Sequence, residues 1–263
     1  MSSNSAPESG LFRQRFLGQK PLMGTFIKTP SVHATEILGG LGFDFVVIDE
    51  EHAPFDRETI DLVLLAARAA GTAGIVRVAE PTASKILSVL DCGAAGVLVP
   101  HVSSAAKAQE IAAAARYRGG KRGFSNSPRA GGYGTLSIWQ HVDAGDAAAT
   151  VIAMIEDPEA LDEIEAIAAV DGLDGFFIGR GDLTVALGAP AMDAPAVRIA
   201  VERIAAAAQA AGKPVCVMAN SVADAEAMKA LGASAFIVSS DQGLMRQAAL
   251  KVLADFTPVR ADA

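Results

Sequence analysis

Acidic side chains and a histidine directly follow an apolar run early in the chain. Residues 43–48 read F-D-F-V-V-I, which is typical of a buried strand, and D-E-E-H (49–52) comes next, before Pro54. Carboxylates and an imidazole at one place can bind a divalent cation or move a proton. Acidic residues also fill surface turns and cap helices. Four titratable groups directly after a buried strand nevertheless favour a site over a surface turn.

Three later apolar runs also end in side chains that could do chemistry, namely Arg77, Glu156 and Asp182. Glu156 and Asp182 supply two hard oxygen ligands, which suit Mg²⁺ or Mn²⁺ and leave positions open for water and substrate. Arg77 carries a permanent cation that can hold a carboxylate or stabilise a developing oxyanion. Each residue also has a simpler interpretation: Glu156 and Arg77 as partners of neighbouring charges, and Asp182 as a helix cap.

Short apolar runs alternate with helically patterned segments along most of the chain. In segments 59–70, 83–91 and 196–208 the apolar residues return every three or four positions, which predicts helices with one buried face. Near-continuous apolar strands separated by helices predict a parallel sheet covered by helices, because each crossover must return the chain to the starting edge. The predicted strands are 21–27, 43–49, 73–78, 95–99, 150–156, 174–179, 214–219 and 235–239.

Eight such units favour an α/β fold closed into a TIM (β/α)8 barrel. The competing fold is an open doubly wound sheet, which commonly has a glycine-rich phosphate turn after its first strand. Here that turn reads F-I-K-T-P-S, without such glycines. Since the reaction site of a parallel barrel lies at the carboxyl ends of its strands, Asp49, His52, Arg77, Glu156 and Asp182 are expected to converge there.

The domain organisation predicted from these patterns is a single barrel over residues 20–257. A polar N-terminal tail and lead-in (1–19) precedes it, and a short C-terminal tail (258–263) follows. A long loop at 116–149 interrupts the barrel, and its first part (116–135) is too rich in Gly, Pro, Ser and Arg for a packed element. Loops of this length in compact domains are usually functional or disordered.

Composition narrows the classes of partner. The chain has 263 residues, of which 51% are hydrophobic and 20% charged, and its apolar runs are too short to span a bilayer, which predicts a soluble protein without a membrane partner. The polar start does not resemble an export signal, and the two cysteines have no metal or disulfide spacing, so the expected location is cytoplasmic. With a net charge of -8, nucleic acid is not an expected partner, and a small molecule is.

Other histidines and lysines offer weaker candidates. His33 and His141 fall in predicted helices and are expected to be surface or packing residues, whereas His101 follows the fourth strand on the productive rim. A Schiff-base aldolase would need a lysine desolvated inside the barrel. Lys213 precedes its strand and would lie on the wrong rim, which leaves Lys28 as the lysine just beyond a strand end.

Taken together, several motifs resemble the metal-dependent (class II) pyruvate aldolases. That family includes 4-hydroxy-2-oxoheptanedioate aldolase, 2-dehydro-3-deoxyglucarate aldolase and hydroxypyruvate aldolase, and its fold is a barrel of the phosphoenolpyruvate/pyruvate-domain type. The resemblance covers about residues 20–255 and rests on the order and spacing of the following motifs: I-D-E-E-H-A-P (48–54), V-R (76–77), L-D-C-G (90–93), L-V-P (98–100), M-I-E (154–156) and D-G-F-F-I-G-R-G-D-L-T (174–184).

The resemblance implies an enzyme that forms the enolate of pyruvate or hydroxypyruvate and adds it reversibly to an aldehyde. Glu156 and Asp182 would bind a divalent metal (Mg²⁺, Mn²⁺ or Co²⁺) that chelates the 2-oxoacid. His52 would be the base and Arg77 would steady the enolate. Main-chain amides near Gly181 and Asp182 would hold the substrate carboxylate.

Further implied roles concern supporting residues and assembly. Asp49 and Asp91 would orient His52 or raise its basicity, with Asp91 contributed by a neighbouring subunit. Phe26 and Met154 would line the substrate pocket, at positions where the family often has Trp and Gln. The resemblance also implies a homohexamer, in which the apolar last helix (244–256) would pack against a neighbour.

Two departures leave the substrate open. The family more often has D-G-E-H, so Glu50 adds a charge beside the base, and G-R-G-D-L-T replaces a commoner G-P-A-D-L-S. The alternatives to an aldolase are a metal-dependent 2-oxoacid decarboxylase or acyl-CoA lyase on the same barrel, and a non-catalytic 2-oxoacid-binding protein. A sensor needs binding groups but no base, so the presence of His52 together with Arg77, Glu156 and Asp182 favours the enzyme.

Overall fold

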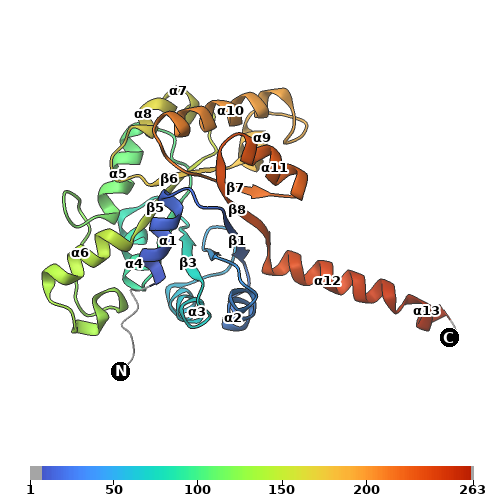
Figure 1. The fold of residues 1–263 in the computed structure, drawn as a ribbon, viewed down its shortest axis with the longest axis horizontal. Helices are drawn as coiled ribbons and strands as arrows, with labels where there is room; N and C mark the ends of the chain where they lie inside the picture. Colours follow the sequence, from blue (N-terminus) through green and yellow to red (C-terminus); the bar gives the residue numbers. More distant parts are fainter. Residues whose placement is uncertain (1–7, 262–263) are drawn as a thin grey trace.

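The computed structural model describes residues 8–261, and its strands form one closed parallel barrel in which each strand pairs with the next and β8 pairs with β1 (Figure 1). The predicted barrel is therefore confirmed, and each predicted strand agrees with an observed one to within two residues at either end. The strands are β1 (Leu22–Ile27), β2 (Phe45–Asp49), β3 (Ala73–Arg77), β4 (Gly96–Val99), β5 (Thr150–Ile155), β6 (Gly175–Ile178), β7 (Val215–Ala219) and β8 (Ala233–Ser240).

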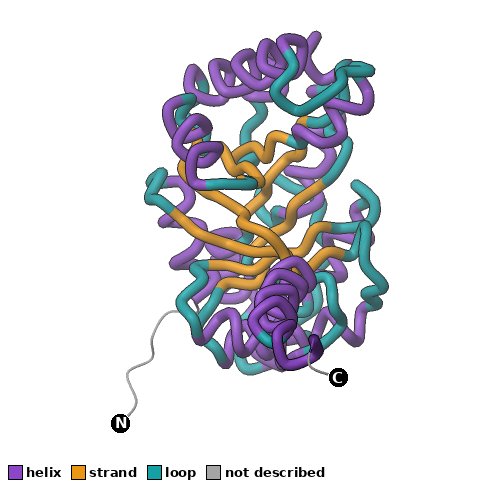
Figure 2. The backbone as a smooth tube through the Cα atoms, turned by 90° about the vertical axis from the view of Figure 1, so that its right-hand side faces the viewer, coloured by secondary structure: helices purple, strands orange, loops and turns teal. Residues whose placement is uncertain are grey.

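Helices surround the strands on the outside of the barrel (Figure 2). Those that follow β1 to β4 are α2 (Val32–Gly40), α3 (Arg57–Ala69), α4 (Ala83–Asp91) and α5 (Ala105–Ala115). The later ones are α7 (Glu159–Asp162), α8 (Ile164–Ala168), α9 (Arg180–Ala186), α10 (Pro195–Ala210), α11 (Val222–Ala230), α12 (Asp241–Asp255) and α13 (Thr257–Ala261). Within residues 8–261, no helix is both long and apolar enough to cross a membrane.

The long insertion between β4 and β5 is only partly irregular. It contains a short 3-10 helix, η1 (Arg129–Gly134), and then α6 (Ile138–Ala148), which begins with a capping box between Ser137 and Gln140. His141 lies buried in α6, where its Nδ1 is 3.0 Å from Asn126 Oδ1 and its Nε2 is 3.2 Å from the Tyr117 hydroxyl. The second half of the predicted long loop at 116–149 is thus a helix, which agrees with the prediction that His141 lies in a helix, and its capping box stabilises its start.

Side chains alternate between two apolar cores. Along β2, Val46 and Ile48 face outward and pack under the surrounding helices, whereas Phe45 and Val47 belong to the core inside the barrel. The inner core continues with alternate residues of the neighbouring strands, including Ala73, Ile75, Ile152, Met154 and Phe177. This period of two follows from strand geometry, and it determines which residues beyond each strand end can face the barrel axis.

The amino ends of the strands are closed by α1 (Glu8–Leu17), which lies across the barrel opening (Figure 1). Its Phe12 ring packs 5.4 Å from the ring of Phe45, at the start of β2, and 5.8 Å from the ring of Phe16. Phe16 packs against Gly175, where an added Cβ would lie 2.7 Å from its ring. Part of the predicted tail (1–19) is therefore a packed helix, because two aromatic side chains in it complete the core. Residues 1–7 and 262–263 lie outside the described residues.

Replacing Phe16 by Ala is expected to lower the free energy of unfolding by about 3–5 kcal/mol. Phe16 is 1% exposed, whereas Leu17, its neighbour on the same helix, is 39% exposed. Urea unfolding followed by circular dichroism measures the loss, and Leu17→Ala is the matched control. Equal effects of the two substitutions would contradict the assignment of Phe16 to the core.

The last two helices point away from the barrel. In Figure 1, α12 leaves the end of β8 and extends outward, with α13 at its far end. Large apolar side chains are exposed along this C-terminal arm: Met245, Leu250, Val252, Leu253, Phe256 and Val259. The arm therefore carries apolar surface that the described part of the chain does not cover.

Candidate active site

The side chains at the barrel mouth continue the inward phase of the strands. Asp49 comes two residues after Val47, Arg77 two after Ile75, and Glu156 two after Met154, so their side chains enter the barrel axis from β2, β3 and the end of β5. All three are buried despite their charge. A buried charge is costly unless it is paired, so the contacts of each residue show how its charge is stabilised.

Asp49 and Arg77 form a two-point ion pair at the centre of this mouth. Arg77 Nε donates to Asp49 Oδ1 at 2.9 Å and Arg77 Nη2 donates to Oδ2 at 2.7 Å. Lys28 Nζ, from the end of β1, lies 2.9 Å from Oδ2, and the amide of His52 donates to Oδ1 at 3.1 Å. Asp49 thus holds the guanidinium and the start of the turn that carries His52, without contacting the imidazole.

These partners lower the pKa of the Asp49 carboxyl. Burial alone would raise the pKa, but the hydrogen bonds and charges of Arg77 and Lys28 outweigh burial. A carboxyl whose pKa is lowered by folding stabilises the protein fully above its unfolded pKa, ordinarily 3.8, and loses that contribution as the pH falls further.

We therefore expect Asp49→Asn to flatten the acid side of the stability profile. Below pH 4 the wild-type free energy of unfolding falls partly because the unfolded chain protonates Asp49 more readily than the folded protein does, at up to about 1.4 kcal/mol per pH unit. The variant lacks that proton uptake. Urea unfolding at several pH values between 2 and 7 measures the slope, with Asp143→Asn as control because Asp143 forms an exposed surface pair with Arg118. Parallel acid slopes for wild type and Asp49→Asn would contradict this prediction.

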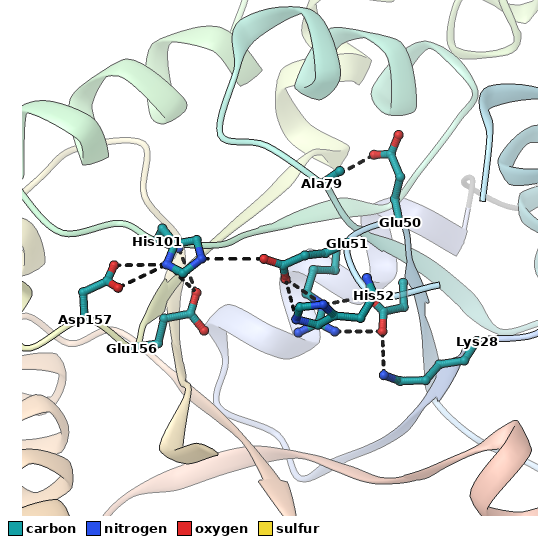
Figure 3. A network of polar contacts seen from close by, with 10 residues as sticks. Lys28, Glu50, Glu51, His52, Ala79, His101, Glu156 and Asp157 are labelled. Carbon is teal, nitrogen blue, oxygen red and sulfur yellow. Dashed lines mark hydrogen bonds and ion pairs between the residues drawn. The ribbon is translucent and has the colours of Figure 1, made fainter. Parts of the chain in front are cut away.

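Glu51 connects the ion pair to two histidines (Figure 3). Its Oε2 lies 3.3 Å from Arg77 Nε and 3.7 Å from His52 Nε2, and its Oε1 lies 3.8 Å from His101 Nε2. The His52 side chain is 57% exposed at the mouth. Sequence reasoning assigns no role to Glu51, although it lies next to the proposed base. Its position two residues after Asp49, on the same turn, is the feature that could have indicated a role.

Glu156 is held by the main chain of His101. The His101 amide donates to Glu156 Oε1 at 2.8 Å, and His101 has a φ of 55°, a left-handed conformation that is uncommon outside glycine. The His101 ring places Nδ1 3.1 Å from Asp157 Oδ1 and 3.6 Å from Glu156 Oε1. Burial opposes the imidazolium, but the neighbouring carboxylates, Asp157 first, raise the pKa of His101.

Glu156 also faces the turn that carries Asp182. It packs against Gly179, where an added Cβ would lie 2.7 Å from Glu156 Oε2, and Asp182 is exposed in the first turn of α9. Burial raises the pKa of Glu156 to about 7, and the negative charges of Asp182 and Glu51 add to that rise. The two proposed ligands therefore lie within electrostatic reach of each other.

The donor set fits a divalent cation with few protein ligands. A buried carboxylate beside other carboxylates is stabilised in its ionised form when a cation lies between them. Residues 8–261 contain no cluster of three or more His, Cys, Asp or Glu side chains arranged to hold a metal. Glu156 and Asp182 offer two carboxylate groups here, and a site completed by water or substrate oxygens is a common arrangement for Mg²⁺.

Apolar residues complete the mouth. Phe26 is buried at the end of β1, and its ring centroid lies 4.9 Å from Arg77 Cζ and 5.6 Å from Lys28 Nζ. Met154 is buried in the inner core of the barrel, and Gly181 is exposed beside Asp182. Phe26 therefore stacks under both cations, which restricts their positions.

Two residues with suggested roles near His52 have other contacts. Asp91 ends α4, the helix that leads away from the β3 end of the mouth, and its Oδ1 accepts from Arg122 Nη2 at 3.1 Å. Glu50 points away from the histidines in Figure 3; its carboxylate accepts from Lys85 Nζ at 2.6 Å and from the Ala79 amide at 3.2 Å. Glu50 thus ties the turn after β2 to the turn after β3 instead of facing the substrate.

The lysines that a Schiff-base mechanism would use are held by other protein groups. Lys213 Nζ donates to the carbonyl oxygens of Val170 and Leu173 at 2.8 and 2.5 Å, before the start of β7, and therefore at the end of the barrel opposite the mouth. Lys28 Nζ pairs with Asp49. His33, in α2, lies 3.5 Å from the Ser31 hydroxyl, away from these groups.

Comparison with known proteins gives one consistent result. The chain is 34% identical over 247 residues to the 5-keto-4-deoxy-D-glucarate aldolase of Shigella dysenteriae, covering 93% of this chain and 96% of that protein. It is 35% identical over 254 residues to the enzyme of the same name from Citrobacter koseri, covering 96% and 97%.

Solved structures agree with these relatives. An HpcH/HpaI aldolase/citrate lyase family protein from Burkholderia cenocepacia superposes with a TM-score of 0.89 at 29% identity, covering 94% of this chain and 99% of that one. A structure described as citrate synthase SbnG gives a TM-score of 0.85 at 30% identity, covering 95% and 98%. The family model described as HpcH/HpaI aldolase/citrate lyase matches residues 22–248. The chain therefore belongs to the HpcH/HpaI aldolase/citrate lyase family.

Proposed function

We propose that this chain, an aldolase and hence a carbon-carbon lyase of that family, uses the enolate of pyruvate or hydroxypyruvate as its nucleophile. It adds the enolate to an aldehyde and, in reverse, cleaves 4-hydroxy-2-oxoacids. The observation that carries the proposal is the barrel mouth, where His52 lies beside Glu51, and Glu51 lies near both the Arg77–Asp49 ion pair and His101, which in turn contacts Glu156 (Figure 3). The relatives named 5-keto-4-deoxy-D-glucarate aldolase support a sugar-acid substrate.

In the proposed mechanism His52 moves the proton. Its exposed imidazole accepts a proton from C3 of the 2-oxoacid, the C3 carbon of the enolate then bonds to the aldehyde carbon, and the new alkoxide takes the proton back from His52. Glu51 Oε2, 3.7 Å from His52 Nε2, stabilises the imidazolium between these steps. One proton thus leaves carbon and arrives at oxygen, so the addition balances without a further reactant.

Arg77 is positioned to stabilise the enolate oxygen. Asp49 engages its Nε and Nη2 in a planar two-point contact, and this contact fixes the orientation of the guanidinium while Nη1 stays available for substrate. A divalent cation, Mg²⁺, Mn²⁺ or Co²⁺, held by Glu156 and Asp182 would polarise the 2-oxo group. Main-chain amides near Gly181 and Asp182 would hold the substrate carboxylate, and Phe26 and Met154 would shape the pocket.

A turnover screen tests the proposal. Pyruvate and hydroxypyruvate are each paired with several aldehydes, including semialdehydes with a carboxylate, with and without Mg²⁺, Mn²⁺ and Co²⁺. We expect metal-dependent products that EDTA abolishes. Borohydride trapping of a pyruvate adduct with activity undiminished by EDTA would show a Schiff-base enzyme instead. Pyruvate formed from oxaloacetate, or turnover of an acyl thioester, without aldol activity would show a decarboxylase or acyl-CoA lyase.

We also propose that the chain assembles as a homo-oligomer, a hexamer by resemblance, through the C-terminal arm. The exposed Met245, Leu253 and Phe256 on α12 and at its end would pack against a neighbouring subunit. Asp91, which lies away from His52 within its own chain, would then act on the mouth of a neighbour. Light scattering tests assembly: a monomer at working concentration, or no change of mass in Phe256→Glu, would refute the role of the arm.

A further inference from the structure

Arg180 bridges two of the turns that form the rim of the barrel mouth. It is the first residue of α9, directly after Gly179 and two residues before Asp182. Its Nη1 donates to Asp224 Oδ1 at 2.7 Å, and its Nη2 donates to Asp224 Oδ2 at 2.7 Å and to the Met218 carbonyl oxygen at 2.5 Å. The contact therefore ties the turn after β6 to the end of β7 and the start of α11.

Neither glycine beside Arg180 has a side chain that could anchor the turn. At Gly179 an added Cβ would lie 2.5 Å from the Glu156 Cβ, so no side chain fits there. At Gly181 an added Cβ would have no atom within 4 Å. Glycine also gives the backbone the greatest conformational freedom. The Arg180 side chain, the buried Leu183 and the Thr184 hydroxyl, which donates to the Arg180 carbonyl oxygen at 2.6 Å, hold this stretch in place, together with the Gly179 amide, which donates to the Ile155 carbonyl oxygen at 3.0 Å.

The partner of Arg180 is itself fixed. Asp224 Oδ2 also accepts from the Asn220 amide at 2.9 Å, and the Asp224 amide donates to the Ser221 hydroxyl at 3.1 Å at the start of α11. The hydrogen bond from Arg180 is the largest cause of the lowered pKa of Asp224. The side chains of Arg180 and Asp224 are 10% and 21% exposed, so solvent screens this pair less than a surface pair.

We propose that Arg180 is a positioning residue: through its two-point contact with Asp224 it holds the turn after β6 so that Asp182 stays beside Glu156 in a geometry that can share one divalent cation. This inference rests on the proposed metal site. Groups that orient metal ligands without touching the metal typically contribute about 10- to 100-fold to metal affinity or activity.

Mn²⁺ binding to the full chain tests the inference independently of turnover. Isothermal titration calorimetry is run on wild type, Arg180→Met, Asp224→Asn and the double variant, at a temperature where circular dichroism shows all of them folded. We expect each single variant to bind Mn²⁺ about 10- to 100-fold more weakly. The double variant should bind no more weakly than the weaker single variant, because both substitutions break the same contact. Arg180→Lys, which keeps the charge but loses the planar two-point contact, should be intermediate.

The control and the kinetic readout separate positioning from general destabilisation. Arg118→Met breaks an Arg–Asp pair whose side chains are 56% and 62% exposed and should leave Mn²⁺ affinity unchanged. Saturating Mn²⁺ should restore most of the turnover number of Arg180→Met. Wild-type affinity in Arg180→Met or Asp224→Asn would overturn the inference while leaving the proposed function intact. No Mn²⁺ binding to wild type would overturn both.

Discussion

Changing His52 to Ala is expected to slow the exchange of pyruvate C3 protons with D₂O by about 10²- to 10⁴-fold, the usual contribution of a positioned acid–base group. The exchange reports enolate formation alone, without an aldehyde, so the result does not depend on knowing the second substrate. Arg77 and Glu156 keep their own partners in the variant, namely the Asp49 carboxylate and the His101 amide. Binding of the 2-oxoacid should therefore survive while proton removal does not.

Proton NMR of the pyruvate methyl signal over time measures this exchange. His33→Ala is the matched control, because His33 lies in α2 and, among the described residues, its ring has a polar contact with the Ser31 hydroxyl alone. His101→Ala is run in parallel, since His101 is the other imidazole near Glu51. Exchange at the wild-type rate in His52→Ala, with loss of exchange in His101→Ala, would transfer the role of base from the first histidine to the second.

Changing Glu156 to Gln is expected to weaken Mn²⁺ binding by more than about 100-fold, because loss of a direct ligand should exceed the 10- to 100-fold cost of losing a supporting group. The amide is nearly isosteric with the carboxylate, so it can keep the contact with the His101 amide while removing the charge. Aldol turnover and methyl-proton exchange should fall together, because both need the 2-oxo group polarised.

Calorimetric titration with Mn²⁺ measures this effect, together with exchange rates at several Mn²⁺ concentrations. Glu165→Gln is the control; it removes the charge of a glutamate whose side chain is 69% exposed on α8. If Glu156→Gln bound Mn²⁺ as tightly as wild type, Glu156 would not be a ligand. The buried carboxylate would then serve only to receive the His101 amide.

Most of the barrel, and the site residues that lie on or directly after strands, can be predicted from the sequence for one physical reason. Side chains on a strand alternate between its two faces, so Asp49, Arg77 and Glu156 can be assigned to the barrel axis once the strands are recognised from their apolar runs. The same regularity places Phe26 and Met154 inside. The positions of these side chains follow from the local geometry of a strand, and the sequence pattern indicates where the strands are.

Residues on turns and in irregular segments could not be placed in that way. The contacts of Glu51 with two histidines depend on how the turn after β2 folds back, and the role of His101 depends on a left-handed backbone at that residue. Glu50 lies between Asp49 and Glu51 in the chain yet turns outward to Lys85. Likewise, α1 lies in a segment whose start is polar, and its packing depends on two phenylalanines that need the barrel to be present.

The alternation of side chains along the strands also places a layer of apolar side chains below the charged groups of the mouth. Val47, Ile75 and Met154 precede Asp49, Arg77 and Glu156 by two residues on the inward face of β2, β3 and β5, and each of the three is 1% exposed. Substitutions that change the volume of this layer would shift the charged groups above it. For altering which aldehydes the enzyme accepts, that layer is a second set of positions to vary, hidden from solvent and separate from the residues that perform the chemistry.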